Sequence, residues 1–281
     1  MNIATDAPKR PALRYYGGKW NLAPWIISHF PPHKNYVEPC GGAASVLLQK
    51  PRSPLETYND LDGNVVNFFR VLRDKPDELI QKIKLTPWAR EEFDNAKRMD
   101  GCPVERARKM VIVSWMGTNG GTNLDNSGLN FRTQVNGVSR CGDISSNALY
   151  EIACRLQNVQ IEKLPVIECI CKYDGVDSLI YVDPPYISET RTDSSVYAFE
   201  WNEENHVNAA ELLRNAKGFV VVSGYACPLY TDIYESHGWR RVDKESQTNS
   251  GGKRIESLWL SPRTWNALQN DYSDLGLFAS T

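Results

Sequence analysis

The sequence predicts a doubly wound α/β fold, with a mostly parallel sheet and an antiparallel edge at the C-terminal end. Short apolar runs alternate with helical segments on both sides of a long polar loop, a pattern typical of parallel sheets. Residues 239–246 and 255–262 flank a Gly-Gly turn and predict the antiparallel pair. The 281 residues suffice for one large domain with a smaller insertion.

Two strand-helix steps are predicted in the first part of the chain. The segment RYYGGKW places a Gly-Gly turn before an apolar helical stretch that runs to residue 30. Residues 36–39 then form a short strand, and the small residues of CGGAASVLLQK open a helix. A second strand, 56–59, leads through Asp60 into a helix over 61–74.

A helical region and a polar loop separate these steps from the rest of the sheet. Residues 76–116 have a helical pattern with many charges, and residues 117–147 are rich in Gly, Asn and Ser. Compact domains rarely keep so long an irregular loop unless it is functional or disordered. The chain then predicts a helix at 148–156, strands at 159–162 and 179–182, a helix at 203–215 and a buried strand at 218–225.

Polar and proline-containing motifs follow three of the predicted strands. They are Glu38-Pro39-Cys40-Gly41-Gly42, Asn59-Asp60, and the end of LIYVDPPY, which is Asp183-Pro184-Pro185-Tyr186. Ligands of doubly wound sheets bind beyond the carboxyl ends of the strands. We therefore expect the three motifs to converge on one crevice.

The first two motifs indicate a nucleoside cofactor that has no pyrophosphate. Small residues after Glu38 let a helix begin close to a ligand, but neither G-x-G-x-x-G nor G-K-[ST] is present. Asp60 is suitably placed to accept hydrogen bonds from both hydroxyls of a ribose. It could instead cap the following helix, or do both.

The third motif predicts a clamp for a flat ring that carries an amine. Asp183 can accept from the amine N–H groups and so direct the nitrogen lone pair at an electrophile. The rigid Pro184-Pro185 backbone can offer a second acceptor at the Pro184 carbonyl, and Tyr186 offers a ring for stacking. The alternative is that Asp183 simply initiates a stiff turn.

These motifs, in this order, resemble the Dam-like family of adenine-specific DNA methyltransferases, which use S-adenosylmethionine. The resemblance spans residues 15–262 and rests on RYYGGKW, VEPCGGAASVLL, YNDLDGN and VDPPY. It implies a Rossmann-like methyltransferase fold and adenine methylation in a specific DNA sequence, with base flipping. Two residues depart from the family pattern E-P-F-x-G-x-G: Cys40 replaces the aromatic residue and Ala44 replaces the second glycine.

The resemblance also implies roles for individual residues. The residues expected to hold the cofactor are Tyr15, Lys19, Glu38, Pro39, Gly42, Asp60 and Asp183, whereas Asp183, Pro184, Pro185 and Tyr186 would hold the target adenine. Tyr15 could equally be a core aromatic, and Lys19 a solvated surface charge. No metal is expected, because methyl transfer from a sulfonium needs no Lewis acid.

The resemblance divides the chain into a catalytic domain, 11–75 with 146–265, and a mainly helical target-recognition insertion, 76–145, with a hairpin-like loop and with tails at 1–10 and 266–281. Residues 86–145 hold eight Lys/Arg against seven Asp/Glu, so the insertion is not plainly basic. Its polar side chains include types that pair with base edges. The candidates for contact with double-stranded DNA are Arg14, Asn123, Asn130 and Arg132, although Asn-rich loops are more often simple turns.

Composition excludes several other classes of protein. The formal net charge of −2 indicates no global attraction to polyanions, and seven scattered cysteines without a C-x-x-C pair predict reduced thiols rather than a zinc site. No apolar run predicts a signal peptide or membrane helix, so we expect a cytoplasmic protein of a bacterial or phage-infected cell. We also expect a monomer.

Two other functions stay as alternatives: a methyltransferase that acts on RNA adenine or protein glutamine, and a catalytically silent DNA-binding relative. The sequence leaves open which DNA sequence is recognised and whether the protein belongs to a restriction-modification system or to a phage.

Overall fold

The computed structural model describes residues 7–118, 124, 129–132, 146–187, 199–247 and 253–274. In its first half the elements are α1 (Ala23–Ile27), β1 (Asn35–Glu38), α2 (Ser45–Gln49), β2 (Leu55–Asn59), α3 (Gly63–Asp74), α4 (Pro76–Lys84), α5 (Arg90–Ala96) and α6 (Pro103–Met116). In its second half they are α7 (Ser146–Arg155), β3 (Val159–Glu162), α8 (Val166–Tyr173), β4 (Ser178–Val182), α9 (Glu203–Arg214), β5 (Phe219–Gly224), α10 (Pro228–Ile233), η3 (Glu235–His237), β6 (Arg240–Gln247), β7 (Lys253–Leu260) and α11 (Pro262–Asp274).

The described strands form one seven-stranded sheet in the order β3-β2-β1-β4-β5-β7-β6. Neighbours from β3 to β5 are parallel, and β7 is antiparallel to both β5 and β6. In register, Val37 on β1 lies opposite Thr57 on one side and Ile180 on the other. The predicted fold class is confirmed, including the antiparallel edge.

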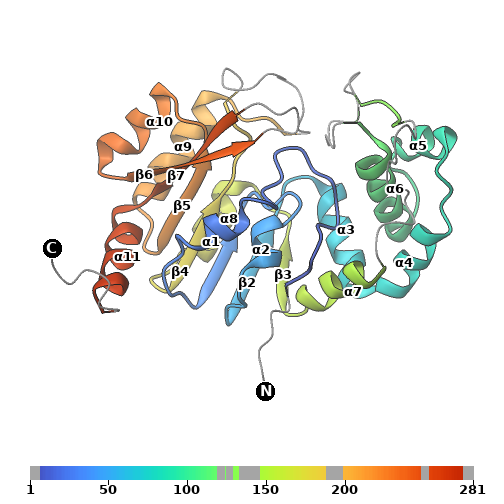
Figure 1. Ribbon diagram of the computed structural model, residues 1–281, viewed down its shortest axis with the longest axis horizontal. Helices are drawn as coiled ribbons and strands as arrows, with labels where there is room; N and C mark the ends of the chain where they lie inside the picture. The colour runs from blue at the N-terminus through green and yellow to red at the C-terminus, as the bar shows by residue number, and fades with distance from the viewer. Residues whose placement is uncertain are drawn as a thin grey trace.

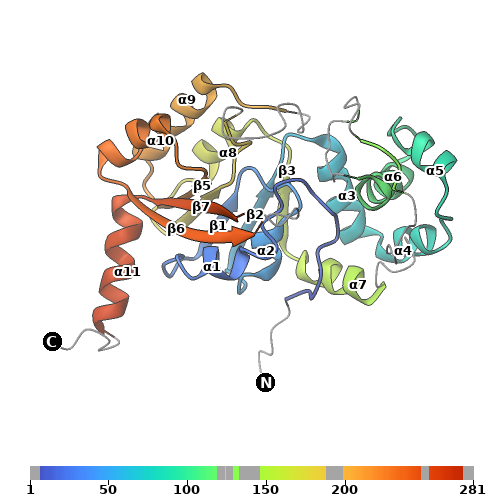
Figure 2. The ribbon, with the colours of Figure 1, turned by 45° about the horizontal axis from the view of Figure 1, so that its top comes forward.

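Side-chain alternation along β4 explains why helices cover both faces of the sheet. All of β4 is buried; Leu179 and Tyr181 belong to the core beneath α2 and α3, while Ile180 and Val182 belong to the core beneath α8, α9 and α10. A parallel strand covered on both faces is apolar throughout, which accounts for the run LIYV. Figures 1 and 2 show the resulting layers, with the sheet between its helices.

The segment between β2 and β3 forms a helical region at one end of the molecule. Figure 1 shows α4, α5 and α6 on the far side of α3 from the sheet. Phe93 and Ile112 belong to a separate small core there, while Val104 and Met110 of α6 join the core of the sheet domain. Gly117 and Phe131 pair in an antiparallel bridge, so the described ends of the intervening loop lie side by side, as in a hairpin. The loop itself lies mostly outside the described residues.

A buried ion cluster fixes the chain where it returns from this region. Arg155, at the end of α7, donates to both carboxylate oxygens of Glu56 on β2, at 2.5 and 2.9 Å, and to the carbonyl oxygen of Leu47, at 2.6 Å. Lys50 donates to the same carboxylate at 2.7 Å. Because a buried charge is costly without its partners, loss of any one of these groups should be strongly destabilising.

Three α-helices of the described part, α8, α10 and α11, were not predicted from the sequence. The short α8 begins with β-branched residues, which weakens its local preference for a helix. A helical signal did exist, because Val166, Cys169, Ile170 and Tyr173 recur at helical spacing and pack into one core. A tail was expected from residue 266, whereas α11 continues to Asp274. The Ser261 hydroxyl accepts from the Thr264 backbone N–H at 3.3 Å, and Thr264 in turn bonds to Val220 of β5, so the start of α11 is anchored to the sheet.

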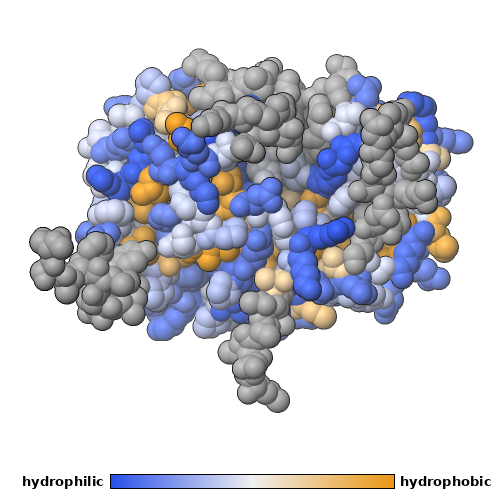
Figure 3. Space-filling model, in the orientation of Figure 1, coloured by the Kyte–Doolittle hydropathy of each residue, from blue (hydrophilic) through white to orange (hydrophobic). Residues whose placement is uncertain are grey.

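The surface of the described part is mixed in polarity. On the face shown in Figure 3, hydrophobic residues form small separate areas among polar ones. No helix in the described part of the chain is long and apolar enough to span a bilayer.

Candidate active site

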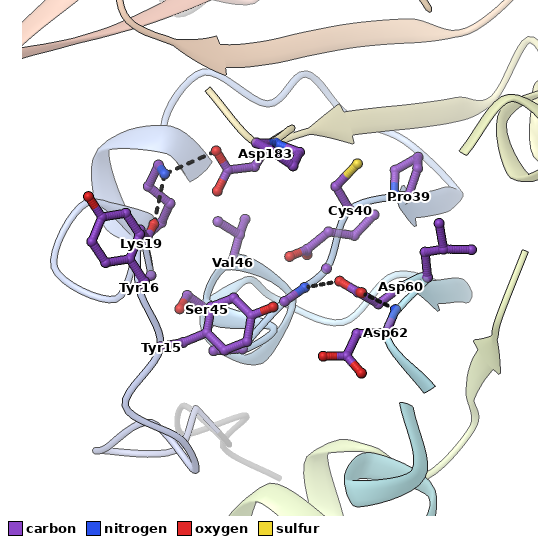
Figure 4. A pocket seen from close by; sticks show the side chains of 18 of the residues that line it. Tyr15, Tyr16, Lys19, Pro39, Cys40, Ser45, Val46, Asp60, Asp62 and Asp183 are labelled. Atoms are coloured by element: carbon purple, nitrogen blue, oxygen red, sulfur yellow. Dashed lines mark hydrogen bonds and ion pairs between the residues drawn. The ribbon is translucent and has the colours of Figure 1, made fainter. Parts of the chain in front are cut away.

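A pocket lies where the strand order reverses, beyond the carboxyl ends of β1 and β4. The segment that follows β1 leads toward β2, and the segment that follows β4 leads toward β5. Because the two segments run in opposite directions, a crevice is left between them. The pocket measures about 780 Å³ with its open mouth included. It is lined by Tyr15, Tyr16, Gly17, Gly18, Lys19, Glu38, Pro39, Cys40, Gly41, Gly42, Ala43, Ser45, Val46, Asp60, Leu61, Asp62, Val166, Tyr181, Asp183, Pro185, Phe199 and Trp201. Figure 4 shows Asp183 and Lys19 near one another and Asp60 on the other side of the pocket.

Glu38, at the end of β1, is buried beneath the pocket and holds the following helix in place. Its Oε2 accepts from the Tyr36 hydroxyl at 2.7 Å and from the backbone N–H of Leu47 at 3.0 Å. Burial raises the pKa of the Glu38 carboxyl to about 8, although both of these hydrogen bonds act to lower it. The geometry therefore supports a structural role beside any contact with a ligand.

The turn after Glu38 brings backbone close to the pocket. A Cβ on Gly41 would lie 2.2 Å from the Tyr58 ring, so only glycine fits there. Gly42 and Ala44 both have positive φ, 46° and 55°. The left-handed conformation at Ala44 explains why a glycine suits this position in the family pattern, and Ala44 keeps it at some cost.

Asp60, beyond the end of β2, faces the same turn. Its Oδ2 accepts from the Gly42 N–H and its Oδ1 from the Asp62 N–H, each at 2.8 Å. Burial raises the pKa of Asp60 to about 6. Each oxygen keeps a second lone pair for a ligand hydroxyl. The helix cap is Asp62, which accepts from Asn64 N–H at the start of α3, so the capping alternative for Asp60 falls away.

Asp183, beyond the end of β4, forms an ion pair with Lys19. The Lys19 Nζ lies 3.0 Å from Asp183 Oδ1, donates to the Gly17 carbonyl at 2.8 Å and sits 4.6 Å from the centre of the Tyr186 ring. Within the described residues, Asp183 Oδ1 is buried and accepts no hydrogen bond of good geometry. Burial raises the pKa of Asp183, and the Lys19 charge opposes that rise.

The structure brings most of the predicted site residues together. The predicted residues that line the pocket are Tyr15, Lys19, Glu38, Pro39, Gly42, Asp60, Asp183 and Pro185. Pro184 and Tyr186 are buried beside them, and the Tyr186 ring lies against the ammonium of Lys19.

The predicted DNA contacts lie elsewhere. Arg14 is tied through its backbone to Ser114 of α6, and its guanidinium lies 6.0 Å from the centre of the Trp115 ring. Arg132 donates to the carbonyl of Thr118 at 3.0 Å and so supports the base of the hairpin-like loop, with exposed Asn130 beside it. Asn123 lies outside the described residues.

Several site residues escaped prediction. Val166 comes from the unpredicted α8, and Phe199 and Trp201 come from the segment before α9. Glu256 on β7 accepts from the Tyr186 hydroxyl. No signal in the sequence singled out Glu256, because every residue of β7 from Glu256 to Leu260 is buried and burial does not alternate there.

Comparisons with known proteins agree with the geometry. The family model described as D12 class N6 adenine-specific DNA methyltransferase matches residues 15–249. Type II methyltransferase M.MjaIII of Methanocaldococcus jannaschii is 22% identical over 281 residues, which covers 89% of this chain and 96% of the relative. Type II methyltransferase M1.LlaDCHI of Lactococcus lactis subsp. cremoris is 26% identical over 290 residues, and DNA adenine methylase of Escherichia coli 25% over 274, each covering 89% of this chain and 94% of the relative.

Proposed function

The chain belongs to the D12 class of N6 adenine-specific DNA methyltransferases, and we propose that Asp183, Pro184 and Tyr186 hold its target adenine while the pocket before them holds S-adenosylmethionine. The family reaction transfers a methyl group from S-adenosylmethionine to the adenine N6 in DNA. Membership decides for DNA over the RNA and protein substrates that the sequence had left open. The observation that carries the residue assignment is the convergence of Asp60 and Asp183 on one pocket at the reversal of strand order.

The residues of the pocket fit this cofactor. Asp60 offers acceptors for ribose hydroxyls, and the close approach of Gly41 and Gly42 leaves room for a ligand against the backbone. The sequence has no loop of the kind that cradles a pyrophosphate. When bound, S-adenosylmethionine supplies an electrophilic methyl group at its sulfonium. The residues of the protein must therefore orient the adenine amine so that its nitrogen lone pair faces that methyl group.

Asp183 is suited to orient the attacking nitrogen. A carboxylate oxygen accepts an N–H of the adenine amine, which fixes the amine in the site and directs its lone pair. The Pro184 carbonyl, held by the Pro-Pro backbone, is proposed as the second acceptor. Asp183 Oδ1 is buried and its neighbour is an ammonium, so a directed acceptor already exists before substrate binds.

Lys19 occupies the place that the adenine amine would need. Its ammonium is next to Asp183 and lies over the Tyr186 ring, which is where a stacked base would put its own amine. Both cannot be there together. We therefore propose that the Lys19 side chain moves aside when the base enters, and that until then it neutralises the buried carboxylate.

Base extrusion follows from the burial of the acceptor. An adenine that is stacked and paired in a duplex cannot place its amine against a carboxylate at the bottom of a pocket, so we propose that double-stranded DNA delivers the base by flipping. Unstacking costs a few kcal/mol, and stacking on Tyr186 offsets part of that cost.

The insertion over residues 76–145 is proposed to read the DNA sequence, and residues 11–75 with 146–265 to form the catalytic domain. The support is the small core around Phe93 and Ile112, which is distinct from the core of the sheet domain that α4 and the first half of α6 join, and the antiparallel base of the loop at Gly117 and Phe131. Arg14, Asn123, Asn130 and Arg132 stay candidate contacts with DNA. We propose that the enzyme acts as a monomer in the cytoplasm, where the DNA is.

Two experiments test the proposal. Calorimetry should show binding of S-adenosylhomocysteine and its loss in Asp60→Ala, whereas tight binding of a nicotinamide dinucleotide with none of S-adenosylhomocysteine would refute the pocket assignment. Sequencing of modified bases in DNA exposed to the enzyme should reveal N6-methyladenine at one recurrent sequence. Methylation without sequence preference would contradict the role proposed for the insertion.

A further inference from the structure

A second buried carboxylate lies behind the proposed adenine clamp. Glu256 on β7 is 9% exposed, and each of its oxygens accepts from a different phenol. Its Oε2 accepts from the Tyr186 hydroxyl and its Oε1 from the Tyr225 hydroxyl, both at 3.2 Å. Tyr225 follows β5, so a further strand of the sheet reaches the site through this residue.

The two tyrosine rings also touch each other. Tyr186 and Tyr225 meet edge to face, with centroids 4.6 Å apart and planes at 78°. Arg254, two residues before Glu256, donates to the Tyr225 hydroxyl at 3.1 Å. The Tyr186 ring is therefore held at its hydroxyl by Glu256 and at its side by Tyr225, while its free face carries the Lys19 ammonium.

The two hydrogen bonds require that both terminal atoms of the Glu256 side chain act as acceptors. An ionised carboxylate accepts on both oxygens and donates on neither. An amide accepts on one end and donates on the other, so a glutamine here would satisfy only one of the two phenol protons. The remaining buried O–H would lose its acceptor, and its ring would be free to turn.

We propose that Glu256 is a positioning residue for methyl transfer, which fixes the plane of the Tyr186 ring through its hydroxyl so that the target adenine stacks in one orientation. The inference rests on the proposed function of Tyr186 as the stacking platform. An aligned base places its amine against Asp183, whereas a tilted ring would leave the base bound but misdirect the amine. Glu256 should thus affect the rate of transfer more than the affinity for DNA.

The test compares Glu256→Gln, Tyr186→Phe and the double variant in single-turnover methyl transfer at saturating DNA and S-adenosylmethionine. Each single change should slow transfer about three- to tenfold, the effect of one lost hydrogen bond. If Glu256 acts through the Tyr186 hydroxyl, the double variant should be no slower than the slower single variant. Glu245→Gln, an exposed carboxylate on β6, serves as the matched control with the parental rate.

A spectroscopic readout separates positioning from a general structural effect. With 2-aminopurine in place of the target adenine, stacking on Tyr186 quenches the emission, and Glu256→Gln should raise it while the affinities for DNA and S-adenosylhomocysteine stay parental. A parental rate with parental emission in Glu256→Gln, or effects that multiply in the double variant, would overturn the inference. A parental rate in Tyr186→Ala would instead refute the proposed stacking function.

Discussion

Replacement of Asp183 by asparagine tests the central step of the mechanism. The change keeps the size of the side chain but removes the charge and turns one of the two acceptor ends into a donor. In the parent, Asp183 Oδ1 is buried and lies 3.0 Å from the Lys19 ammonium, so the oxygen becomes available for an adenine amine once that ammonium moves. In the variant the NH₂ group of the asparagine can point at the adenine amine. Two donors then face each other, so they repel, and the lone pair of the adenine nitrogen is no longer directed at the methyl group.

The expected magnitude follows from the hydrogen bond that is lost. A bond to a charged acceptor contributes about 1.5 to 3 kcal/mol, and about 1.4 kcal/mol corresponds to tenfold in rate, so transfer should slow by roughly 10- to 150-fold. Misdirected attack should add to this loss. The affinity for DNA should not fall, because the incoming base no longer has to displace Lys19 from a carboxylate.

The assay is single-turnover methyl transfer on a duplex that contains the recognition sequence, alongside DNA binding by fluorescence anisotropy. Asp177→Asn is the matched control, since this exposed carboxylate pairs with Lys34 at 2.9 Å far from the pocket and should leave the rate unchanged. A parental transfer rate in Asp183→Asn would remove Asp183 from the mechanism. Equal losses of rate and of DNA affinity would show that the carboxylate acts in binding rather than in the chemical step.

Three further predictions concern the stacking ring, a buried acid and the turn. Tyr186→Ala should slow transfer at least tenfold with little change in affinity for S-adenosylhomocysteine, and a parental rate on duplex DNA would contradict stacking. Because the folded-state pKa of Glu38 is raised from 4.5 to about 8, the folded state holds a proton that the unfolded state releases, so the free energy of unfolding should fall as pH rises from about 5 to 8. Glu38→Gln should flatten that decline in urea titrations, and an unchanged slope would refute the assignment. Gly41→Ala should destabilise the fold by about 1 to 3 kcal/mol and weaken binding of S-adenosylhomocysteine, because the added Cβ would lie 2.2 Å from the Tyr58 ring. In the control Gly175→Ala the added Cβ would lie 3.4 Å from its nearest neighbour, the Ser178 hydroxyl, so neither effect is expected.

The sequence determined the fold class and the location of the pocket. The apolar run LIYV could be recognised as a strand covered on both faces, and parallel strands share one carboxyl edge, so Glu38, Asp60 and Asp183 had to lie near one another. Local patterns sufficed because Glu38 ends β1 and Asp60 and Asp183 directly follow β2 and β4, so each residue takes its position from the strand next to it.

The tertiary structure alone decided which side chains meet. Lys19 and Asp183 are far apart in the chain, and nothing local to either residue indicates that their charges form a buried pair. The same holds for Tyr225 and Glu256, which reach Tyr186 from β5 and β7 and fix its ring. The partners of Glu256 depend on how β4, β5 and β7 are ordered in the sheet, and that order is set by packing over the whole chain.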